Sequence, residues 1–268
     1  MSAARGVPHS HVHIAPVTEV TITGGCIYAR LMALGRIVAI GGGGFSTEGD
    51  ASPLDDYVLA LTGKDQPRVC FLGTATGDAD GYALKFFNAF AARRCKPSRL
   101  SLFSPGAIPP ADVVAEQDVL YVGGGSTVNL LALWRAHGLG DAMRHAWEHG
   151  AVLCGPSAGA MCWFESGITD SFGVGELRPL LDGLGLLRGS FCPHFDTEAE
   201  RRPSYLRMIA GGTLSDGYAC DDSAALHFEG TELVEVVASK PEASAYRVER
   251  TPTGAACTAL DVRLLCGE

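Results

Sequence analysis

The sequence contains no hydrophobic stretch long enough to cross a membrane as a helix. Its longest apolar run without a charge lies near residues 151–164, which is shorter than the roughly 20 residues that a spanning helix needs. The first residues also lack the continuous apolar segment of a secretory signal. We therefore expect a protein that has no membrane partner and works in the cytoplasm.

Cysteine pairs in the C-x-x-C spacing of metal and redox sites are absent as well. The nine cysteines are irregularly spaced, and several stand inside apolar runs, as Cys70, Cys154, Cys162 and Cys192 do. An odd number of cysteines in such surroundings is typical of buried, reduced thiols. This pattern also favours a cytoplasmic compartment, because thiols stay reduced there.

Positive charge is scarce. The chain has 21 lysines and arginines against 30 aspartates and glutamates, which gives a net charge of −9. Such a charge disfavours nucleic acid and anionic membranes as main partners. The phosphate-binding patterns G-x-x-x-x-G-K-[ST] and G-x-G-x-x-G are missing too. A non-enzymatic nucleotide- or phosphate-binding module stays open only through the glycine runs at 41–44 and 123–125, which follow apolar segments.

What the 268 residues do contain is an alternation of short apolar runs and helical patterns. Buried strands are predicted at 37–40, 69–72, 118–122 and 151–154. Helices are predicted from 81 to 94, from 126 or 127 to 138, and from 141 to 149. This alternation is typical of an α/β fold with a doubly wound, mostly parallel sheet, whose ligands bind beyond the carboxyl ends of the strands. Antiparallel strands are predicted at 233–238 and 245–249, near the C-terminus.

The first 31 residues differ from the rest of the chain. A new α/β pattern begins near Met32, so residues 1–31 are interpreted as an N-terminal extension and residues 32–268 as a single α/β domain. The extension holds three alternating histidines that could bind a metal, namely His9, His11 and His13. A loosely packed or disordered tail is the favoured interpretation of this segment.

One short segment points to chemistry. The apolar run 151–154 leads directly into Gly155-Pro-Ser-Ala-Gly159, a G-x-S-x-G turn between a strand and a helix. A serine at such a turn projects its hydroxyl from the backbone, and the flanking glycines leave room for a substrate. The N–H groups at the start of the following helix lack helical partners and can hold a developing oxyanion. Ser157 is therefore a candidate nucleophile, with an idle serine in a tight turn as the alternative.

A serine hydroxyl needs a base that accepts its proton. Of the eight histidines, His194 is the best placed, because it follows Pro193 at the end of an apolar strand pattern. A third group must orient the imidazole, and Asp221 and Asp222 follow another short apolar stretch. The sequence leaves three other acids open for this role: Asp170, Asp182 and Asp196.

Four short sequence motifs follow one another along the chain. They are Val122-Gly-Gly-Gly-Ser-Thr-Val-Asn-Leu-Leu131, Gly155-Pro-Ser-Ala-Gly-Ala160, Pro193-His-Phe195 and Ala219-Cys-Asp-Asp-Ser223. Over residues 36–249 the chain resembles the dipeptidase E (aspartyl dipeptidase) and cyanophycinase family of serine peptidases. The resemblance implies a class I glutamine-amidotransferase-like, flavodoxin-like fold.

The resemblance also implies roles for single residues. Ser157 would be the nucleophile and His194 the general base, while Asp222 stands where the family usually has glutamate, with Asp221 as the nearest substitute. The oxyanion hole would consist of the Ala158 N–H and a glycine N–H of the 123–125 loop, Gly124 or Gly125. No metal or cofactor is implied. The chain order Ser, His, acid argues against an esterase or lipase, and a glutamine amidotransferase would need cysteine at position 157.

The substrate prediction comes from the same resemblance. Ser126-Thr127 follow the shared glycines, as in the dipeptidase branch, whereas cyanophycinases typically carry an acidic-amide pair there. That branch removes an N-terminal aspartate, so an Asp-X dipeptide is expected, cleaved through an acyl-enzyme. Of the two arginines after His194, Arg201 and Arg202, the second roughly matches the family's aspartate-binding position. A cyanophycinase-like enzyme or another hydrolase of acidic or β-linked peptides is the alternative. The sequence leaves the oligomeric state open, a homodimer included.

Overall fold

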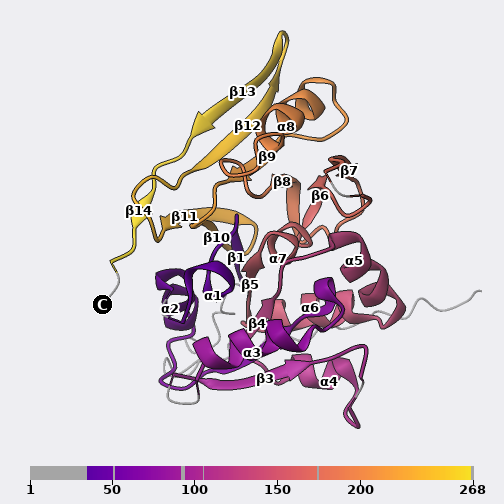
Figure 1. The fold of residues 1–268 in the computed structure, drawn as a ribbon, viewed down its shortest axis with the longest axis vertical. Helices are drawn as coiled ribbons and strands as arrows, with labels where there is room; N and C mark the ends of the chain where they lie inside the picture. The colour runs from indigo at the N-terminus through magenta and orange to yellow at the C-terminus, as the bar shows by residue number, and fades with distance from the viewer. Residues whose placement is uncertain (1–34, 51, 92–93, 105, 174, 267–268) are drawn as a thin grey trace, which may run out of the picture. The chain divides into compact units, whose positions relative to one another are not determined.

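The computed structural model of the chain describes residues 35–50, 52–91, 94–104, 106–173 and 175–266. The predicted extension 1–31, with its three histidines, lies outside these described residues. Within them, the chain forms two β-sheets and the helices that cover them (Figure 1). The larger sheet supplies the framework of the site, and the smaller one brings in the remaining residues of the site.

The larger sheet has eight strands. Their spatial order is β14 (Arg263–Leu264), β11 (Glu232–Ala238), β10 (Ala224–Glu229), β1 (Arg36–Ile40), β5 (Val152–Pro156), β4 (Val119–Val122), β2 (Arg68–Leu72) and β3 (Lys96–Leu100). The five strands from β1 to β3 in this order run parallel. β10 pairs antiparallel with β1, and β11 pairs antiparallel with β10. The strands predicted at 37–40, 69–72, 118–122 and 151–154 are thus confirmed, as is the mostly parallel sheet.

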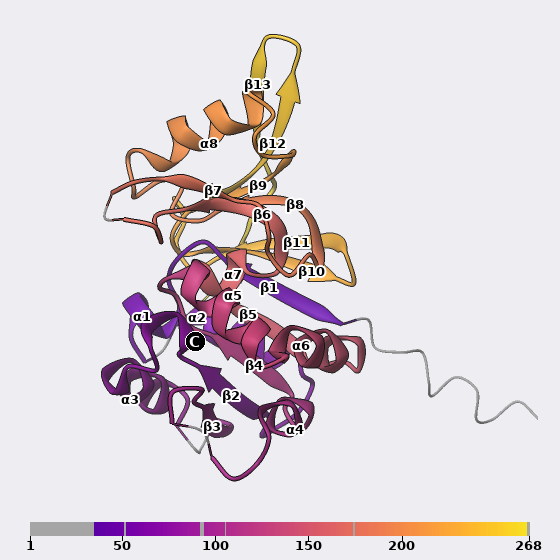
Figure 2. The same cartoon turned by 90° about the vertical axis from the view of Figure 1, so that its right-hand side faces the viewer.

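Helices cover both faces of this sheet, as a doubly wound fold requires (Figure 2). Successive residues of a strand point to opposite faces, so Val38 and Phe71 pack on one side and Ile37 and Leu72 on the other. The first side carries α1 (Phe45–Glu48), α2 (Pro53–Ala60) and α3 (Asp80–Ala89). The second side carries α4 (Pro110–Ala115), α5 (Thr127–Ala136), α6 (Leu139–Glu148) and α7 (Ala158–Met161). A 3-10 turn, η2 (Thr74–Thr76), follows β2.

The smaller sheet has six strands. Their order is β13 (Gly254–Ala259), β12 (Ala245–Thr251), β9 (Gly217–Cys220), β8 (Leu187–Cys192), β6 (Phe164–Thr169) and β7 (Arg178–Leu180). Helix α8 (Arg201–Ala210) packs on this sheet through Tyr205 and Ile209, which join Phe195 and Val248 in one buried cluster. Figure 1 shows α8 alongside β12 and β9. α8 therefore begins close to the end of β8, where His194 stands.

The structure adds two features that the sequence did not indicate and corrects one prediction. The second sheet was not indicated, because β6 contains glycine and serine and does not stand out as an apolar run. β11 and β12 are strands as predicted, but they belong to different sheets. The helix predicted from 81 to 94 ends at Ala89, because Phe90 leaves the helical conformation, with φ −97° and ψ 47°.

The cysteines and the helices bear on two further predictions. The eight described cysteines are unpaired, and six of them are buried, so the prediction of buried thiols is confirmed for these six. No helix in the described part of the chain has the length and apolar character that crossing a membrane requires.

Candidate active site

Ser157 occupies the turn between β5 and α7, at the carboxyl end of the parallel strands. Its backbone has φ 54° and ψ −112°, a region that costs a non-glycine residue about 1–3 kcal/mol. Neighbouring contacts hold this conformation. The Ser157 N–H donates to the carbonyl of Ile40 at 3.0 Å, and the Ser157 carbonyl accepts from Met161 at 2.8 Å. The strain therefore stays in place at the residue predicted to be the nucleophile.

The two glycines of the G-x-S-x-G turn are required by close packing. A Cβ atom at Gly155 would stand 1.9 Å from the carbonyl oxygen of Val122, and one at Gly159 would stand 2.0 Å from the same atom. Both distances are far below van der Waals contact. The turn therefore lies directly on the end of β4, and this brings Ser157 next to the glycine loop that follows β4.

His194 follows β8 and pairs with Asp222, which follows β9. The two atoms of the contact, His194 Nδ1 and Asp222 Oδ1, are 2.6 Å apart, and Thr197 Oγ1 donates to Asp222 Oδ2 at 3.0 Å. Burial alone would raise the pKa of Asp222, but the hydrogen bonds from His194 and Thr197 outweigh it and hold that pKa below its usual value. An ionised Asp222 accepts a hydrogen bond from the Nδ1–H group, which leaves Nε2 as the free acceptor.

Asp221 faces elsewhere. Its Oδ2 accepts the Ser244 N–H at 3.0 Å and lies 3.5 Å from the Tyr246 hydroxyl. The side chain is 4% exposed, and burial raises its pKa to about 6. The structure thus brings Asp222, and not Asp221, to the imidazole.

The other acids considered in the sequence have separate places. Asp196 accepts the backbone N–H of Asp222 at 2.9 Å. Asp182 forms an exposed ion pair with Arg135, and Asp170 lies 3.5 Å from a guanidinium nitrogen of Arg201. None of the three contacts the His194 ring through a hydrogen bond among the described residues.

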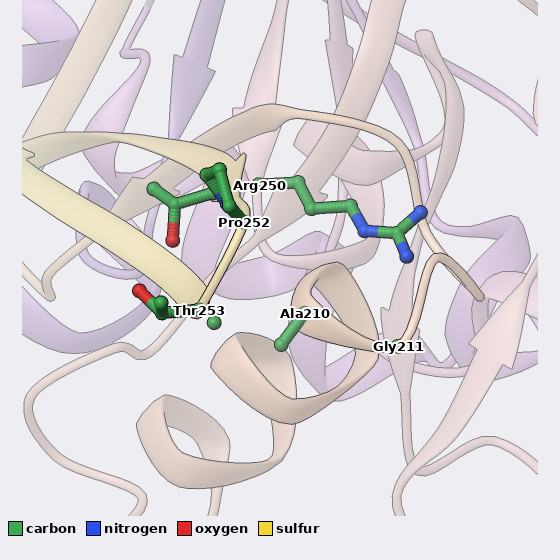
Figure 3. A pocket seen from close by; sticks show the side chains of 7 residues that line it. Ala210, Gly211, Arg250, Pro252 and Thr253 are labelled. Atoms are coloured by element: carbon green, nitrogen blue, oxygen red, sulfur yellow. The ribbon is translucent and has the colours of Figure 1, made fainter.

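A cavity of about 590 Å³ joins the nucleophile and the base. Its lining includes Ser157, His194, Gly125, Ser126, Asp170, Phe172, Glu198 and Arg201. The cavity thus lies between the carboxyl ends of the parallel strands and the start of α8. A volume of this size suits a small peptide. A second cavity of about 750 Å³ lies at the end of α8, beside Arg250 and Thr253 (Figure 3), and contains none of the predicted site residues.

The glycine loop after β4 borders the nucleophile. A Cβ atom at Gly124 would lie 3.6 Å from the Ser157 Cβ, and Gly125 lines the cavity with φ 134°. The Gly124 N–H donates to the Tyr82 hydroxyl at 3.3 Å. Among the described residues the N–H groups of Gly125 and Ala158 have no acceptor. Of the three residues predicted for the oxyanion hole, Gly125 and Ala158 thus have N–H groups that remain available to a substrate.

The two arginines at the start of α8 diverge, because consecutive helix residues are rotated by about 100°. Arg202 lies over the rings of Phe195 and Tyr246, 5.1 Å and 5.4 Å from their centres, and does not line the cavity. Arg201 does line it, although its side chain is only 3% exposed. The sequence prediction placed the substrate-binding arginine at 202, whereas the cavity holds the neighbouring residue.

Arg201 is held by three acceptors. Its Nε donates to Glu198 Oε2 at 2.6 Å and its Nη1 to the Ile168 carbonyl at 2.9 Å, while Nη2 lies 3.5 Å from Asp170. The Asp170 and Glu198 side chains are 49% and 44% exposed. The guanidinium is thus fixed in orientation, and the long contact to Asp170 is the weakest of the three.

Sequence reasoning missed Thr197 and Tyr82. Thr197 stands three residues after the predicted base, so the polar run Asp196-Thr197 directly after Pro193-His-Phe195 was the available signal. Tyr82 lies within the helix predicted from 81 to 94, and nothing local in the sequence indicates that its hydroxyl meets Gly124. Among the remaining described histidines the most buried is His227, which pairs with Tyr57 at 2.7 Å.

In sequence, the chain is similar to known peptidases. Residues 37–236 match peptidase family S51. A protein of Bacillus subtilis (strain 168), described as an uncharacterized peptidase, YgaJ, is 51% identical over 215 residues, which make up 80% of this chain and 91% of that protein.

Two solved structures share the fold. One is a peptidase from an acI-B1 Actinobacterium, with a TM-score of 0.62 and 18% identity, covering 88% of this chain and 100% of that chain. The other is a putative peptidase E protein from Listeria monocytogenes EGD-e, with a TM-score of 0.54 and 19% identity, covering 74% and 96%. The expected class I glutamine-amidotransferase-like fold is confirmed.

Proposed function

The chain belongs to peptidase family S51, and we propose that it cleaves short peptides through an acyl-enzyme on Ser157. In this proposal His194 is the general base and Asp222 orients it. The observation that carries the proposal is that one cavity is lined by both a strained serine and a histidine whose Nδ1 is hydrogen-bonded to a carboxylate. Such an arrangement matches the roles of a serine-peptidase triad.

The proposed reaction has two stages. His194 Nε2 accepts the proton of Ser157 Oγ as the oxygen attacks the peptide carbonyl carbon. The tetrahedral oxyanion then accepts hydrogen bonds from the N–H groups of Gly125 and Ala158. The imidazolium then gives its proton to the leaving amine, and the C–N bond breaks. In the second stage water attacks the ester by the same base catalysis and frees Ser157.

For the substrate we propose dipeptides with an N-terminal aspartate, as the family resemblance implies. Arg201 is the cation that supports this proposal, because it lines the cavity with a fixed, buried guanidinium. A substrate carboxylate can pair with its forked donors and displace the long contact to Asp170. Arg202, which is stacked on two rings outside the cavity, has no part in this proposal.

A hydrolase of β-linked or other acidic peptides is the second candidate, and Arg201 would favour it equally. A non-enzymatic phosphate-binding module is no longer needed to explain the glycine runs. Gly41 and Gly42 pack against Asp221, Asp222 and His194, where any Cβ atom would collide. Glycine is thus needed at these two positions because neighbouring protein atoms leave no room for a side chain.

A dipeptide panel tests the proposal. Wild type and Ser157→Ala are assayed with Asp-Leu, β-Asp-Leu, Asn-Leu and Ala-Leu, and labelling by a fluorophosphonate is followed in parallel. We expect Asp-Leu to exceed Asn-Leu at least ten-fold in kcat/KM, and Ser157→Ala to lose on the order of 10⁶-fold in kcat and all labelling. Turnover that persists in Ser157→Ala would end the acyl-enzyme proposal. Equal rates for Asp-Leu and Asn-Leu would remove only the aspartate preference, and faster cleavage of β-Asp-Leu would favour the second candidate.

A further inference from the structure

The turn that carries the proposed base, His194, also forms hydrogen bonds with the proposed acid, Asp222. After β8 the chain runs from His194 to Thr197 in a turn that is closed by the Glu198 N–H, which donates to the His194 carbonyl at 3.3 Å. Besides His194 itself, two residues of this turn bond Asp222. Asp196 Oδ1 accepts the Asp222 backbone N–H at 2.9 Å, and Thr197 Oγ1 donates to Asp222 Oδ2 at 3.0 Å.

These contacts fix Asp222 at three points. One oxygen of the carboxylate meets His194 Nδ1, the other meets Thr197, and the backbone N–H meets Asp196. A carboxylate with one hydrogen bond can rotate about its Cβ–Cγ bond, whereas two bonds on opposite oxygens fix its plane. Rotation matters here because the Asp222 side chain is 34% exposed and water competes for its oxygens.

Threonine suits this task for a physical reason. Its branched Cβ restricts rotation about χ1, so the hydroxyl is held near one direction before Asp222 is bound. An ordered water at the same place would have to be immobilised, which costs entropy. Thr197 does not line the cavity that contains Ser157, and Asp222 is the partner of its hydroxyl among the described residues.

We propose that Thr197 is a positioning residue, whose hydroxyl holds Asp222 in the orientation that keeps Oδ1 on His194 Nδ1. The proposal rests on the proposed function, because it gives Asp222 its role in catalysis. It also accounts for the aspartate at position 222. An acid that is one methylene shorter than glutamate reaches the imidazole here because the base-bearing turn and the acid are bonded to each other directly.

Two variants of the same residue test this proposal. Thr197→Val keeps the shape of the side chain and removes the donor, and Thr197→Ser keeps the donor. We expect Thr197→Val to lower kcat for Asp-Leu about ten-fold with KM within two-fold, and to slow fluorophosphonate labelling of Ser157 by a similar factor. Thr197→Ser should recover most of both rates. Thr253→Val, at an exposed threonine of the β12–β13 turn, is the matched control and should equal wild type.

The pH profile distinguishes positioning from a general structural effect. A carboxylate that loses a donor holds protons more strongly, so the acid limb of kcat should move to higher pH in Thr197→Val and return in Thr197→Ser. Melting temperatures of all variants should agree within a few degrees, because Thr197 is exposed.

The outcomes separate this inference from the proposed function. If Ser157→Ala is inactive while Thr197→Val keeps the wild-type kcat and acid limb, the role of Thr197 is overturned and the proposed function stands. Equal losses in Thr197→Val and Thr197→Ser would also overturn it, because the hydroxyl would then be irrelevant. Activity that persists in Ser157→Ala would overturn both.

Discussion

Gly42 and Asp222 approach each other so closely that a Cβ atom at position 42 would stand 2.0 Å from Asp222 Oδ1. The same atom would stand 2.7 Å from the His194 ring, at Cε1 and Nδ1. Gly42 does not have the positive φ of its neighbours Gly43 and Gly44, so alanine fits its backbone. The glycine is therefore needed for the contact between His194 and Asp222 and for no reason of local conformation.

We expect Gly42→Ala to separate His194 from Asp222 while the protein still folds. The methyl group cannot be accommodated without moving one of the two side chains, both of which are fixed by hydrogen bonds. The predicted result is a fall of about 100-fold or more in kcat, measured on Asp-Leu, with little change in melting temperature. Gly81→Ala is the control, because nothing lies within 4 Å of its Cβ position. A Gly42→Ala enzyme within two-fold of wild type would contradict this prediction.

The two adjacent aspartates should behave in opposite ways. Asp222→Asn replaces the carboxylate that accepts the His194 Nδ1–H hydrogen bond with an amide, which can also donate. It should lower kcat on the order of 10⁴-fold without unfolding the protein. Asp221→Asn keeps an oxygen acceptor for Ser244 and removes a carboxylate whose burial raises its pKa to about 6. It should leave kcat within a few-fold of wild type. Steady-state assays at pH 8 decide the matter, and a larger loss in Asp221→Asn would reverse the assignment.

The local parts of the site could be predicted from the sequence. Ser157 lies in a turn whose geometry depends on five consecutive residues, and the strands around it are uninterrupted apolar runs. Each strand of the parallel core is short and buried on both faces, so its sequence stands out without knowledge of its partners. The fold class and the place of Ser157 at the strand ends follow from these two facts.

Choices between neighbouring residues could not be predicted. Whether Asp221 or Asp222 faces His194 depends on where the chain leaves β9 and on the bridge between Gly42 and Asp222, which joins residues 180 positions apart. A shift of one residue along an extended chain reverses the facing of every side chain. Likewise, the choice between Arg201 and Arg202 depends on the residue at which α8 begins.

The polar strands escaped prediction for a related reason. β3 has the sequence Lys-Pro-Ser-Arg-Leu and is a strand because it pairs with β2 at the edge of the sheet. Its residues carry little signal of their own, and the pairing is a tertiary effect. The hydrogen bonds from Thr197 and to Asp196 that hold Asp222 are also tertiary effects, since they form only when β8 and β9 pair.

Arg201 should determine the preference for acidic substrates. Arg201→Lys keeps the charge but loses the forked donors that match a carboxylate. We expect KM for Asp-Leu to rise at least ten-fold and kcat/KM for Ala-Leu to change less than three-fold. Arg202→Lys is the matched control, because that guanidinium lies on Phe195 and Tyr246 outside the cavity. Equal changes for Asp-Leu and Ala-Leu in Arg201→Lys would remove Arg201 from substrate recognition.

Asp55 should make stability depend on pH. Its carboxyl group is fully buried, and the Tyr121 hydroxyl donates to Oδ1 at 3.0 Å, while Oδ2 has no partner among the described residues. Burial, partly offset by the Tyr121 hydrogen bond, raises the pKa from 3.8 to about 7. The folded protein thus favours the protonated carboxyl group of Asp55. The stability that this preference contributes is complete below pH 3.8 and is lost as the pH rises through 7.

Urea unfolding of wild type and Asp55→Asn between pH 5 and pH 8 measures this contribution. The free energy of unfolding of wild type should fall with rising pH by about 2–3 kcal/mol more than that of Asp55→Asn, at 1.36 kcal/mol for each pH unit between the two pKa values. Asp56→Asn is the control, because Asp56 is 60% exposed in its ion pair with Arg94 and should keep the wild-type slope. Parallel slopes for wild type and Asp55→Asn would mean that Asp55 is ionised throughout this range, and its missing partner at Oδ2 would then have to be a bound water or a cation.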